Sequence, residues 1–260
     1  MQTITSSTSG YLQTVTLNRV EARNAFNEVM IDELRATFSE VSDSVRAIIL
    51  TGQGSVFCAG ADVNWMRESA SRSESDNRAD AARMEAMFRA IDECPAPVIG
   101  GINGSALGGG MGLLACCDIA VSVDTAQFGF TEVRLGIVPA VISPYSLAKI
   151  GERAARRFFL TGELFDAHRA RELGLIHDVV TADKLESTLH DIADSILKNG
   201  PLAVRTAKNL IREVARMDRE QVREYTTLAI ARVRTSAEGQ EGLSAFLEKR
   251  RPNWLDKKQI

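Results

Sequence analysis

The stretch INGSALGGGMGLLACCD, Ile102–Asp118, leads from an apolar segment through three glycines into apolar residues at helical spacing. The stretch SVFCAGADVNWM, Ser55–Met66, follows the same order, with small residues at its centre. The first amides of a helix have no acceptor within the helix, so they point outward from such a turn. Small side chains let a ligand approach this backbone closely. Two such turns facing each other would aim a pair of N–H donors at one oxygen atom.

Each turn alone is a weak motif, because three glycines after a strand often form an ordinary turn. Other glycine motifs are missing: the chain has no GxxxxGK[ST] phosphate loop and no GxSxG elbow. The run Gly108–Gly110 also lacks the GxGxxG spacing of dinucleotide-binding loops. The prediction of a site in which two amides donate to one oxygen atom therefore depends on both turns together, in this order and spacing.

Four segments in the first half of the chain have the pattern of short strands. They are Thr14–Asn18, Arg46–Gly52, Pro97–Gly104 and Asp118–Asp124. Residues Asn27–Val41 lie between the first two and carry apolar residues at helical spacing. Strands that alternate with helices favour right-handed βαβ connections and mostly parallel sheets, so this part is predicted to be α/β.

The polar stretch Ser69–Arg83, SASRSESDNRADAAR, predicts a mobile loop that runs into a helix around Ala79–Ile91, beginning near Asn77 or Asp80. From about residue 152 the periodicity is helical in several successive segments. The tripeptide at 199–201, Asn-Gly-Pro, marks the end of one helix and the start of the next. We therefore predict a core over residues 1–198 and a C-terminal helical region over residues 199–260.

The composition is that of an ordinary globular protein, with 260 residues, 45% hydrophobic and 25% charged, and a net charge of −3. This slightly acidic balance gives no indication of a nucleic-acid partner. No run approaches the roughly 18 apolar residues of a membrane span, and the start MQTITSSTSG has no features of a secretory signal. We expect a cytoplasmic protein without membrane association.

The cysteines and histidines do not suggest a metal site. The cysteines sit in apolar surroundings, without a CxxC pair or a histidine at ligand spacing, so we interpret them as small buried hydrophobes in a reducing compartment. The histidines are scattered among helical patterns, which makes a histidine-based site improbable. The residues concerned are Cys58, Cys94, Cys116, Cys117, His168, His177 and His190.

Four separated segments resemble, in order, motifs of the crotonase (enoyl-CoA hydratase/isomerase) superfamily over nearly the whole chain. They are NRVEARNAFNEVM (18–30), FCAGAD (57–62), the segment 103–139 ending in FGFTEVRLGIVP, and EGQEGLSAFLEKRRPNW (238–254). Within the superfamily, the chain is most similar to bacterial 3-methylglutaconyl-CoA hydratases of leucine and isovalerate metabolism. The segments that carry this narrower similarity are CAGADVNWM, GGGMGLLACCD, TEVRLGIVPA and EGQEGLSAFLEKR.

The resemblance implies an α/β (α+β) fold, the crotonase spiral of ββα turns with two roughly perpendicular sheets. It implies that the C-terminal helices form a trimerisation region, so the protein would be a homotrimer or a homohexamer built as a dimer of trimers. The expected partner is an acyl-CoA. Coenzyme A is then part of the substrate, and no separate cofactor and no metal are expected.

The resemblance also places the site residues. The amides of Ala61 and Gly109 correspond to the oxyanion-hole donors, which polarise a thioester carbonyl; losing one such donor typically costs about 3 kcal/mol of transition-state stabilisation. Further positions correspond to residues near the pyrophosphate and pantetheine, around the adenine, and on a C-terminal segment that reaches a neighbouring subunit's CoA. In that order they are Ala22 and Arg23; Ala59, Gly60, Asp62 and Val63; and Phe246 and Lys249. For Lys249, a solvated helix face is the alternative.

The family's hydratases usually carry two glutamates at this site. The later one corresponds to Glu132, whereas the earlier position is Gly112, which has no side chain to ionise. One water held by a single carboxylate can supply both the hydroxyl for Cβ and the proton for Cα, so Gly112 weakens the hydratase interpretation without excluding it. Apolar neighbours should raise the pKa of Glu132, unless it is solvated or paired with Arg134. The neighbours expected are Phe128, Phe130, Ile137 and Val138.

The segment PAVISPY, Pro139–Tyr145, replaces a glycine-containing segment of the family and implies an altered acyl pocket. Ala140 stands where dienoyl-CoA isomerases of the family carry an acid. A 3-methylglutaconyl group has a second carboxylate, which should bind a cationic or hydroxyl partner. Candidates are Arg134, Ser143 and Tyr145, each equally consistent with a structural role.

The activity implied by the resemblance is reversible hydration of 3-methylglutaconyl-CoA to 3-hydroxy-3-methylglutaryl-CoA, or the reverse dehydration. The alternatives are Δ3,Δ2-enoyl-CoA isomerisation, which one glutamate would serve, and hydration of a longer, isohexenylglutaconyl-CoA-type substrate. RNA binding, a second role in one eukaryotic branch, and CoA binding without catalysis are more remote. The sequence leaves open the acyl group, the residues that bind its carboxylate, the physiological direction, and the choice between trimer and hexamer.

Overall fold

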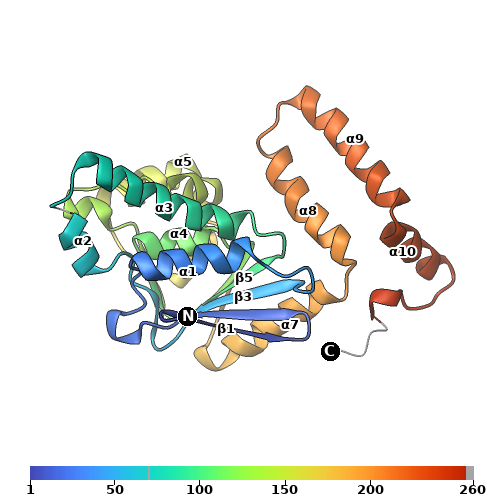
Figure 1. Cartoon of the computed structure of the whole chain (residues 1–260), viewed down its shortest axis with the longest axis horizontal. Helices are drawn as coiled ribbons and strands as arrows, with labels where there is room; N and C mark the ends of the chain where they lie inside the picture. The colour runs from blue at the N-terminus through green and yellow to red at the C-terminus, as the bar shows by residue number, and fades with distance from the viewer. Residues whose placement is uncertain (70, 256–260) are drawn as a thin grey trace.

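The computed structural model describes residues 1–69 and 71–255, and its core contains two β-sheets (Figure 1). The larger sheet has the strand order β1-β2-β3-β5-β7-β10; β1 and β2 pair antiparallel and the other neighbours pair parallel. Its strands are β1 (Ile4–Ser9), β2 (Leu12–Leu17), β3 (Ala47–Gly52), β5 (Val98–Ile102), β7 (Ile119–Val123) and β10 (Asp178–Val180). The four predicted strands are confirmed as β2, β3, β5 and β7.

The smaller sheet has the order β4-β6-β8-β9 and consists of very short strands. They are β4 (Val56–Cys58), β6 (Ser105–Leu107), β8 (Gln127–Gly129) and β9 (Phe165–Asp166). Because β4, β6 and β8 run parallel, the segments that follow them leave the sheet at the same edge. Strands of two or three residues are too short to show an alternating pattern, so the sequence did not indicate this sheet.

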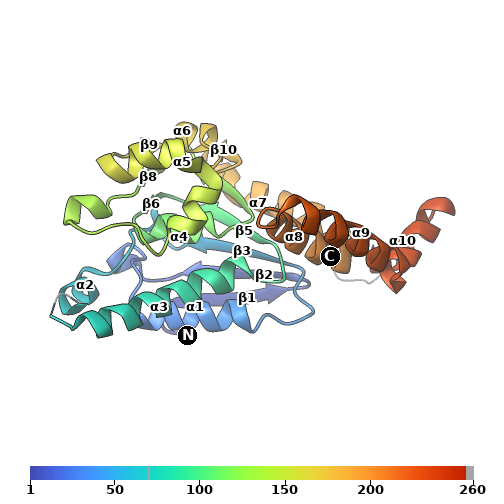
Figure 2. The ribbon, with the colours of Figure 1, turned by 90° about the horizontal axis from the view of Figure 1, so that it is seen from above.

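Helices complete the core around the larger sheet. Helices α1 and α3 pack against each other, and α7 packs against β3, β5 and β7 (Figure 2). The buried side chains of α1 include Leu34 and Phe38, which the helical spacing had predicted to face inward. The helices of this part are α1 (Glu28–Ser39), α2 (Val63–Ser69), α3 (Glu74–Asp92), α4 (Gly109–Ala115), α5 (Ser143–Thr161), α6 (Ala167–Glu172) and α7 (Leu185–Leu197).

Helix α3 begins at Glu74, earlier than the start predicted near Asn77 or Asp80. Ser73 and Asp76 form a capping box, in which each side chain accepts a hydrogen bond from the other residue's amide, at 3.2 and 3.3 Å. This reciprocal capping offsets the weak helix propensity of serine and aspartate. The prediction of a loop was therefore wrong for residues 74–76, whereas the helix predicted over Ala79–Ile91 lies within α3. Ala70, within the same stretch, lies outside the described residues.

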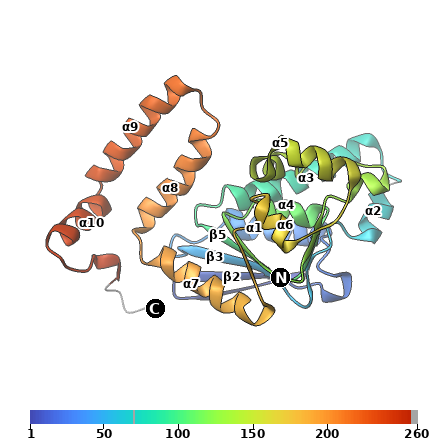
Figure 3. The same cartoon turned by 180° about the vertical axis from the view of Figure 1, so that it is seen from behind.

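The C-terminal helices α8 (Pro201–Val214), α9 (Arg219–Thr235) and α10 (Ala237–Leu247) extend away from the two-sheet core (Figure 3). The predicted break at residues 199–201 is confirmed, since α7 ends at Leu197 and α8 begins at Pro201. Neither α8 nor α9, both fully within the described residues, contains a buried residue. In the described part of the chain, no helix is long and apolar enough to cross a membrane.

Candidate active site

The two glycine-containing turns meet at one edge of the smaller sheet. Strands β4 and β6 are parallel neighbours, so the segments that follow Cys58 and Leu107 leave the sheet together. Gly60 has a positive φ of 94°, and a Cβ built on it would lie 3.2 Å from the Gly109 amide nitrogen. Glycine is thus needed at position 60 for both its conformation and its close approach. The sequence prediction that the two turns face each other is consistent with this contact.

The amides of Ala61 and Gly109 are both unpaired in the described structure. The neighbours of Ala61 pair with Phe26: the Phe26 amide donates to the Gly60 carbonyl at 2.8 Å, and the Asp62 amide donates to the Phe26 carbonyl at 3.0 Å. This parallel bridge leaves the Ala61 amide facing away from Phe26. Gly109 is the first residue of α4 and has no intrahelical acceptor. Both residues are half-buried, so a ligand oxygen could reach them.

Glu132 is held next to the same turn. It begins the short 3-10 helix η2 (Glu132–Leu135). A Cβ built on Gly108 would lie 3.6 Å from Glu132 Oε1, so this carboxylate borders the residue that precedes Gly109. Gly108 itself has φ 51° and ψ −123°, a conformation that residues with a Cβ rarely adopt, and its amide donates to the Gly129 carbonyl. The structure therefore brings Glu132 and one predicted donor together.

The Glu132 carboxylate is available for chemistry. Its Oε2 atom is buried and has no hydrogen-bond partner among the described residues. Burial raises the pKa of Glu132, which is the direction the sequence predicted. Of the predicted apolar neighbours, Phe128 and Phe130 are fully buried, whereas Ile137 and Val138 are 52% and 68% exposed. A partly desolvated carboxylate with one unpartnered oxygen is suited to taking up and releasing a proton.

Position 112 has no room for a second glutamate. A Cβ built on Gly112 would lie 2.4 Å from Ile142 Cγ2 and 2.8 Å from the Phe88 ring, closer than real Cβ contacts. Phe88 also packs against Tyr145, with ring centroids 6.0 Å apart. Gly112 is therefore one wall of a packed apolar cluster. The structure leaves Glu132 as the acid–base candidate beside this turn.

Most of the residues predicted to bind CoA gather beside Ala61. The Ala59 amide donates to the Arg23 carbonyl at 3.0 Å, so residues 22–23 and 59–63 lie side by side. Arg23 and Val63 are exposed, and Ala22 and Ala59 are half-buried. Asp62 is different, because its carboxylate already pairs with Arg19 at 2.9 Å. Its predicted contact with CoA is not tested by this arrangement.

Phe246 and Lys249 are not brought to this site within one chain. They lie at and just after the end of α10, at the opposite end of the molecule from α2 (Figure 1). Phe246 is 82% exposed, and Lys249 is exposed with a positive φ of 54°. Their separation from Ala61 is compatible with the prediction that they serve a neighbouring subunit.

Phe26 is a site residue that the sequence did not indicate. A Cβ on Gly109 would lie 2.2 Å from Phe26 Cζ, so the ring packs directly on the glycine whose amide is free. Phe26 is 1% exposed and also bridges to Ala61 through its backbone. Phe26 lies in the segment NRVEARNAFNEVM, but nothing in that segment predicts that its ring contacts Gly109.

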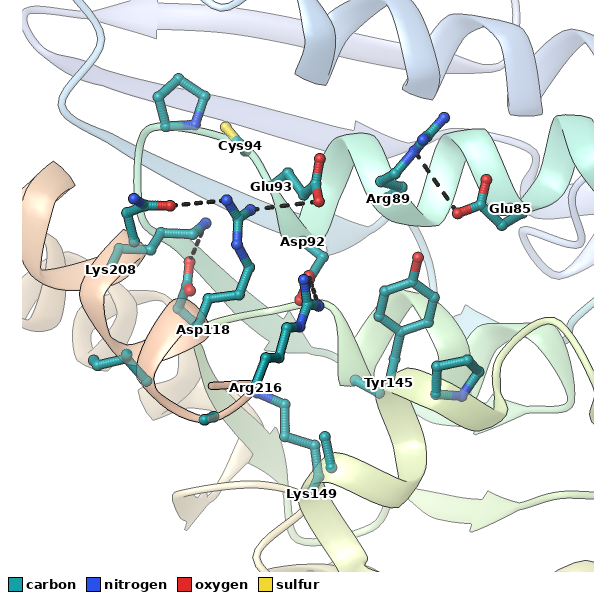
Figure 4. A pocket seen from close by; sticks show the side chains of 18 of the residues that line it. Glu85, Arg89, Asp92, Glu93, Cys94, Asp118, Tyr145, Lys149, Lys208 and Arg216 are labelled. Carbon is teal, nitrogen blue, oxygen red and sulfur yellow. Dashed lines mark hydrogen bonds and ion pairs between the residues drawn. The ribbon is translucent and has the colours of Figure 1, made fainter. Parts of the chain in front are cut away.

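A cavity of about 700 Å³ lies between α3, α5 and α8 (Figure 4). Tyr145 lines it, together with paired charges such as Lys208 and Asp118, but Ala61, Gly109 and Glu132 do not. Burial raises the pKa of Tyr145. Of the other candidates for a substrate carboxylate, Ser143 already donates to the Ala140 carbonyl at 2.7 Å, and Arg134 is exposed.

Within residues 1–69 and 71–255, no group of three or more histidine, cysteine, aspartate or glutamate side chains could hold a metal ion. The four cysteines are free and buried, as predicted. Burial raises the pKa of Cys58 to about 12, so its thiol stays protonated and unreactive near neutral pH.

Comparison with known proteins gives consistent matches. The family model described as enoyl-CoA hydratase/isomerase matches residues 8–257. The chain is 34% identical over 245 residues to a crotonyl-CoA hydratase from Syntrophomonas wolfei, covering 93% of each chain. It is 34% identical over 251 residues to a 2,3-dehydroadipyl-CoA hydratase from Escherichia coli, covering 92% of this chain and 93% of that one. The crystal structure of an enoyl-CoA hydratase from Shewanella pealeana matches with a TM-score of 0.93 and 39% identity, over 97% of this chain and 96% of that one. These matches confirm the predicted fold.

Proposed function

This chain belongs to the enoyl-CoA hydratase/isomerase family, and from that premise we propose that it catalyses the reversible hydration of a 2-enoyl-CoA. One observation carries the proposal: the partly buried carboxylate of Glu132 borders Gly108, and the amide of the next residue, Gly109, is free. Hydration places negative charge on the thioester oxygen while a proton moves nearby. A carboxylate next to free amide donors provides for both events.

In the proposed mechanism, the Ala61 and Gly109 amides donate to the thioester oxygen and make Cβ of the conjugated double bond electrophilic. Glu132 takes a proton from a bound water as its oxygen adds to Cβ, and then returns that proton to Cα. The raised pKa of Glu132 suits this exchange, because the carboxyl then holds and releases a proton closer to neutral pH. One group serves both transfers, so Gly112 does not block the reaction.

For the substrate we propose 3-methylglutaconyl-CoA, giving 3-hydroxy-3-methylglutaryl-CoA, or the reverse dehydration. The similarity of CAGADVNWM and GGGMGLLACCD to that branch supports this choice. So does the similarity to the E. coli hydratase, whose named substrate also ends in a carboxylate. Of the candidate partners for this carboxylate, Tyr145 lines a cavity that Ala61, Gly109 and Glu132 do not line, and the Ser143 hydroxyl is already engaged. An isohexenylglutaconyl-CoA-type substrate is the longer alternative.

Isomerisation of a 3-enoyl-CoA to a 2-enoyl-CoA is the second candidate. The closed packing around Gly112 favours it, because one carboxylate that moves a proton between Cα and Cγ is sufficient. The same two amides would stabilise the dienolate oxygen in that reaction. The candidates differ in whether water is consumed, so they can be separated by the fate of the conjugated thioester.

The test is the absorbance of the enoyl-thioester band, followed in parallel with crotonyl-CoA, 3-methylglutaconyl-CoA and a 3-enoyl-CoA. Hydration bleaches this band, whereas isomerisation of a 3-enoyl substrate creates it. Fastest bleaching with 3-methylglutaconyl-CoA is the expected result. Growth of the band with the 3-enoyl substrate alone would instead identify an isomerase, and no turnover with any of the three would indicate a non-catalytic CoA-binding protein.

The proposal includes assembly as a homotrimer or homohexamer, with residues 199–260 packing between subunits and residues 1–198 forming each core. Large apolar side chains on the C-terminal helices support it: Ile211, Phe246 and Leu247 are 73%, 82% and 78% exposed. Exposed apolar patches of this kind typically mark interaction sites. Light scattering on the full chain measures the assembly, and a monomeric mass would contradict it.

A further inference from the structure

The two oxyanion-hole donors differ in how they are supported. Gly109 begins helix α4, under the Phe26 ring, and the preceding Gly108 amide is bonded to β8 through Gly129. Ala61 lies in the connection 59–62 between β4 and α2, which belongs to neither sheet. Through their backbone groups, its neighbours Gly60 and Asp62 pair with Phe26 in an isolated bridge. The direction of the Ala61 amide therefore depends on whatever holds this connection in place.

The connection is held by a strap, which we define as residues Arg19–Phe26. Two consecutive strap residues, Arg23 and Asn24, have positive φ values of 51° and 55°, a conformation that persists only where the surroundings over-determine it. The Asn24 side chain is fully buried and supplies part of that constraint. Its Nδ2 donates to the carbonyls of Gln53 and Val56 at 2.9 and 2.8 Å, and its Oδ1 accepts from the Arg19 amide at 3.0 Å.

Arg19 joins the strap to the residue after Ala61. Its Nη1 donates to the Ala25 carbonyl, and its Nη2 lies 2.9 Å from Asp62 Oδ2. The side chains of this ion pair are 16% and 9% exposed. The other oxygen, Asp62 Oδ1, accepts from the Asn64 amide at 2.8 Å at the start of α2. Asp62 is thus fixed through its amide, by Phe26, and through both oxygens of its carboxylate.

The protonation of Asp62 agrees with this geometry. Burial alone would raise the pKa of this carboxyl, but hydrogen bonds from Arg19 and from two backbone amides lower it on balance. The carboxylate is therefore charged near neutral pH and keeps its pairing with Arg19.

From these contacts we infer that Arg19 is a positioning residue for the oxyanion hole, which holds the Ala61 amide in the direction of the Gly109 amide through Asp62. Arg19 touches no reacting atom in this scheme. Its effect on rate comes from geometry, because small displacements of a catalytic group can cost large factors in rate. The inference rests on the proposed function, since it assigns Arg19 a role only if Ala61 polarises a thioester.

The test compares Arg19→Met, which keeps much of the apolar stem and removes the charge, with Arg19→Lys and with the matched control Lys208→Met. Lys208, a cation about as buried as Arg19, forms an ion pair with Asp118 at 2.7 Å, away from the strap. The readouts are kcat, KM, and the red shift of the absorption band when a conjugated thioester, cinnamoyl-CoA, binds. That shift reports polarisation of the carbonyl, which a purely structural role would not change.

For Arg19→Met we expect kcat to fall by about ten-fold or more, less than the roughly 100-fold or greater loss on removing a donor outright. KM should change by less than about three-fold, the red shift should shrink, and Arg19→Lys should restore part of both effects. Lys208→Met should keep the full red shift. If Arg19→Met does not fold, Asp62→Asn removes the charge but keeps the Oδ1 acceptor, and should shift the same readouts in the same direction.

A full red shift and unchanged kcat in a folded Arg19→Met or Asp62→Asn variant would overturn this role. Failure of the proposed function looks different: the wild-type chain itself would bind cinnamoyl-CoA without a red shift and would not turn over enoyl-CoA substrates. That result would overturn the role of Arg19 as well, because it would remove the polarisation that Arg19 is inferred to support.

Discussion

Two neighbours of helix α4 differ in chemistry. Next to Gly108, just before the helix, lies the Glu132 carboxylate, which has a buried oxygen without a partner in the described structure. Next to Gly112, on the helix itself, lie Phe88 and Ile142, so close that even a Cβ would overlap with them. The family's hydratases usually carry a glutamate at both places. At position 112 the glutamate is therefore not simply replaced by glycine, because packing also closes the space that its side chain would need.

The largest expected effect comes from removing the one carboxylate. Glu132→Gln keeps the size of the side chain but cannot take a proton from water, so we expect kcat for enoyl-CoA hydration to fall by about 1,000-fold. KM should change little, because the amides of Ala61 and Gly109 still bind the thioester oxygen. Steady-state kinetics on the best substrate measures both constants.

The matched control is Glu152→Gln, an exposed glutamate paired with Arg156 on α5, which should retain wild-type kinetics. Hydration at an undiminished rate by Glu132→Gln would show that another group moves the proton. The difference between the carboxylate beside Gly108 and the apolar packing at Gly112 would then not explain catalysis.

The next largest effect is on stability and concerns Gly112, where packing leaves no room for a side chain. Gly112→Glu would force a carboxylate among Phe88 and Ile142, so we expect the free energy of unfolding to fall by about 3 kcal/mol or more. Gly112→Ala adds only a methyl group and should cost about 1–3 kcal/mol. Urea unfolding measures both. A Gly112→Glu variant as stable as the wild type, and faster in hydration, would mean that the site accepts a second acid.

Long, regular elements were predictable from the sequence, and short or tertiary ones were not. Strands β3 and β7 consist mostly of β-branched and aliphatic residues, a pattern that the sequence shows. Strands β4 and β6 have three residues each, and only their mutual pairing makes them strands. The capping box of α3 is present in the sequence as Ser73 and Asp76, but the polar residues around it are more typical of a loop.

For the site, the motifs predicted the candidate residues but not what surrounds them. Ala61, Gly109 and Glu132 follow from matched segments, and the contact of Glu132 with Gly108 agrees with that prediction. The closure of position 112 depends on Phe88 from α3 and Ile142 from the segment before α5. Such contacts between distant segments leave no local pattern in a single sequence. The partners of Asp62 were missed for the same reason.

The smallest effect is a difference in how stability depends on pH. Burial raises the pKa of Glu132 above its ordinary value of 4.5, so the folded chain holds this proton more tightly than the unfolded chain. The stability that results is fully present below the ordinary pKa and is lost as the pH rises through the raised pKa. Glu132→Gln does not titrate and should not show this loss. Its stability relative to the wild type should therefore increase as the pH rises from below 4.5 toward neutral.

Gly112→Ala is the control for this prediction. It disturbs the packing against Phe88 and Ile142 without adding or removing a titrating group. Its free energy of unfolding should lie below that of the wild type by a constant amount at every pH, while the curve for Glu132→Gln diverges from the wild type. Urea unfolding of the three proteins across this pH range measures the curves. If Glu132→Gln runs parallel to the wild type, the Glu132 carboxyl is as well solvated in the folded chain as in the unfolded one. It would then lack the desolvation that sets it apart from an ordinary surface glutamate.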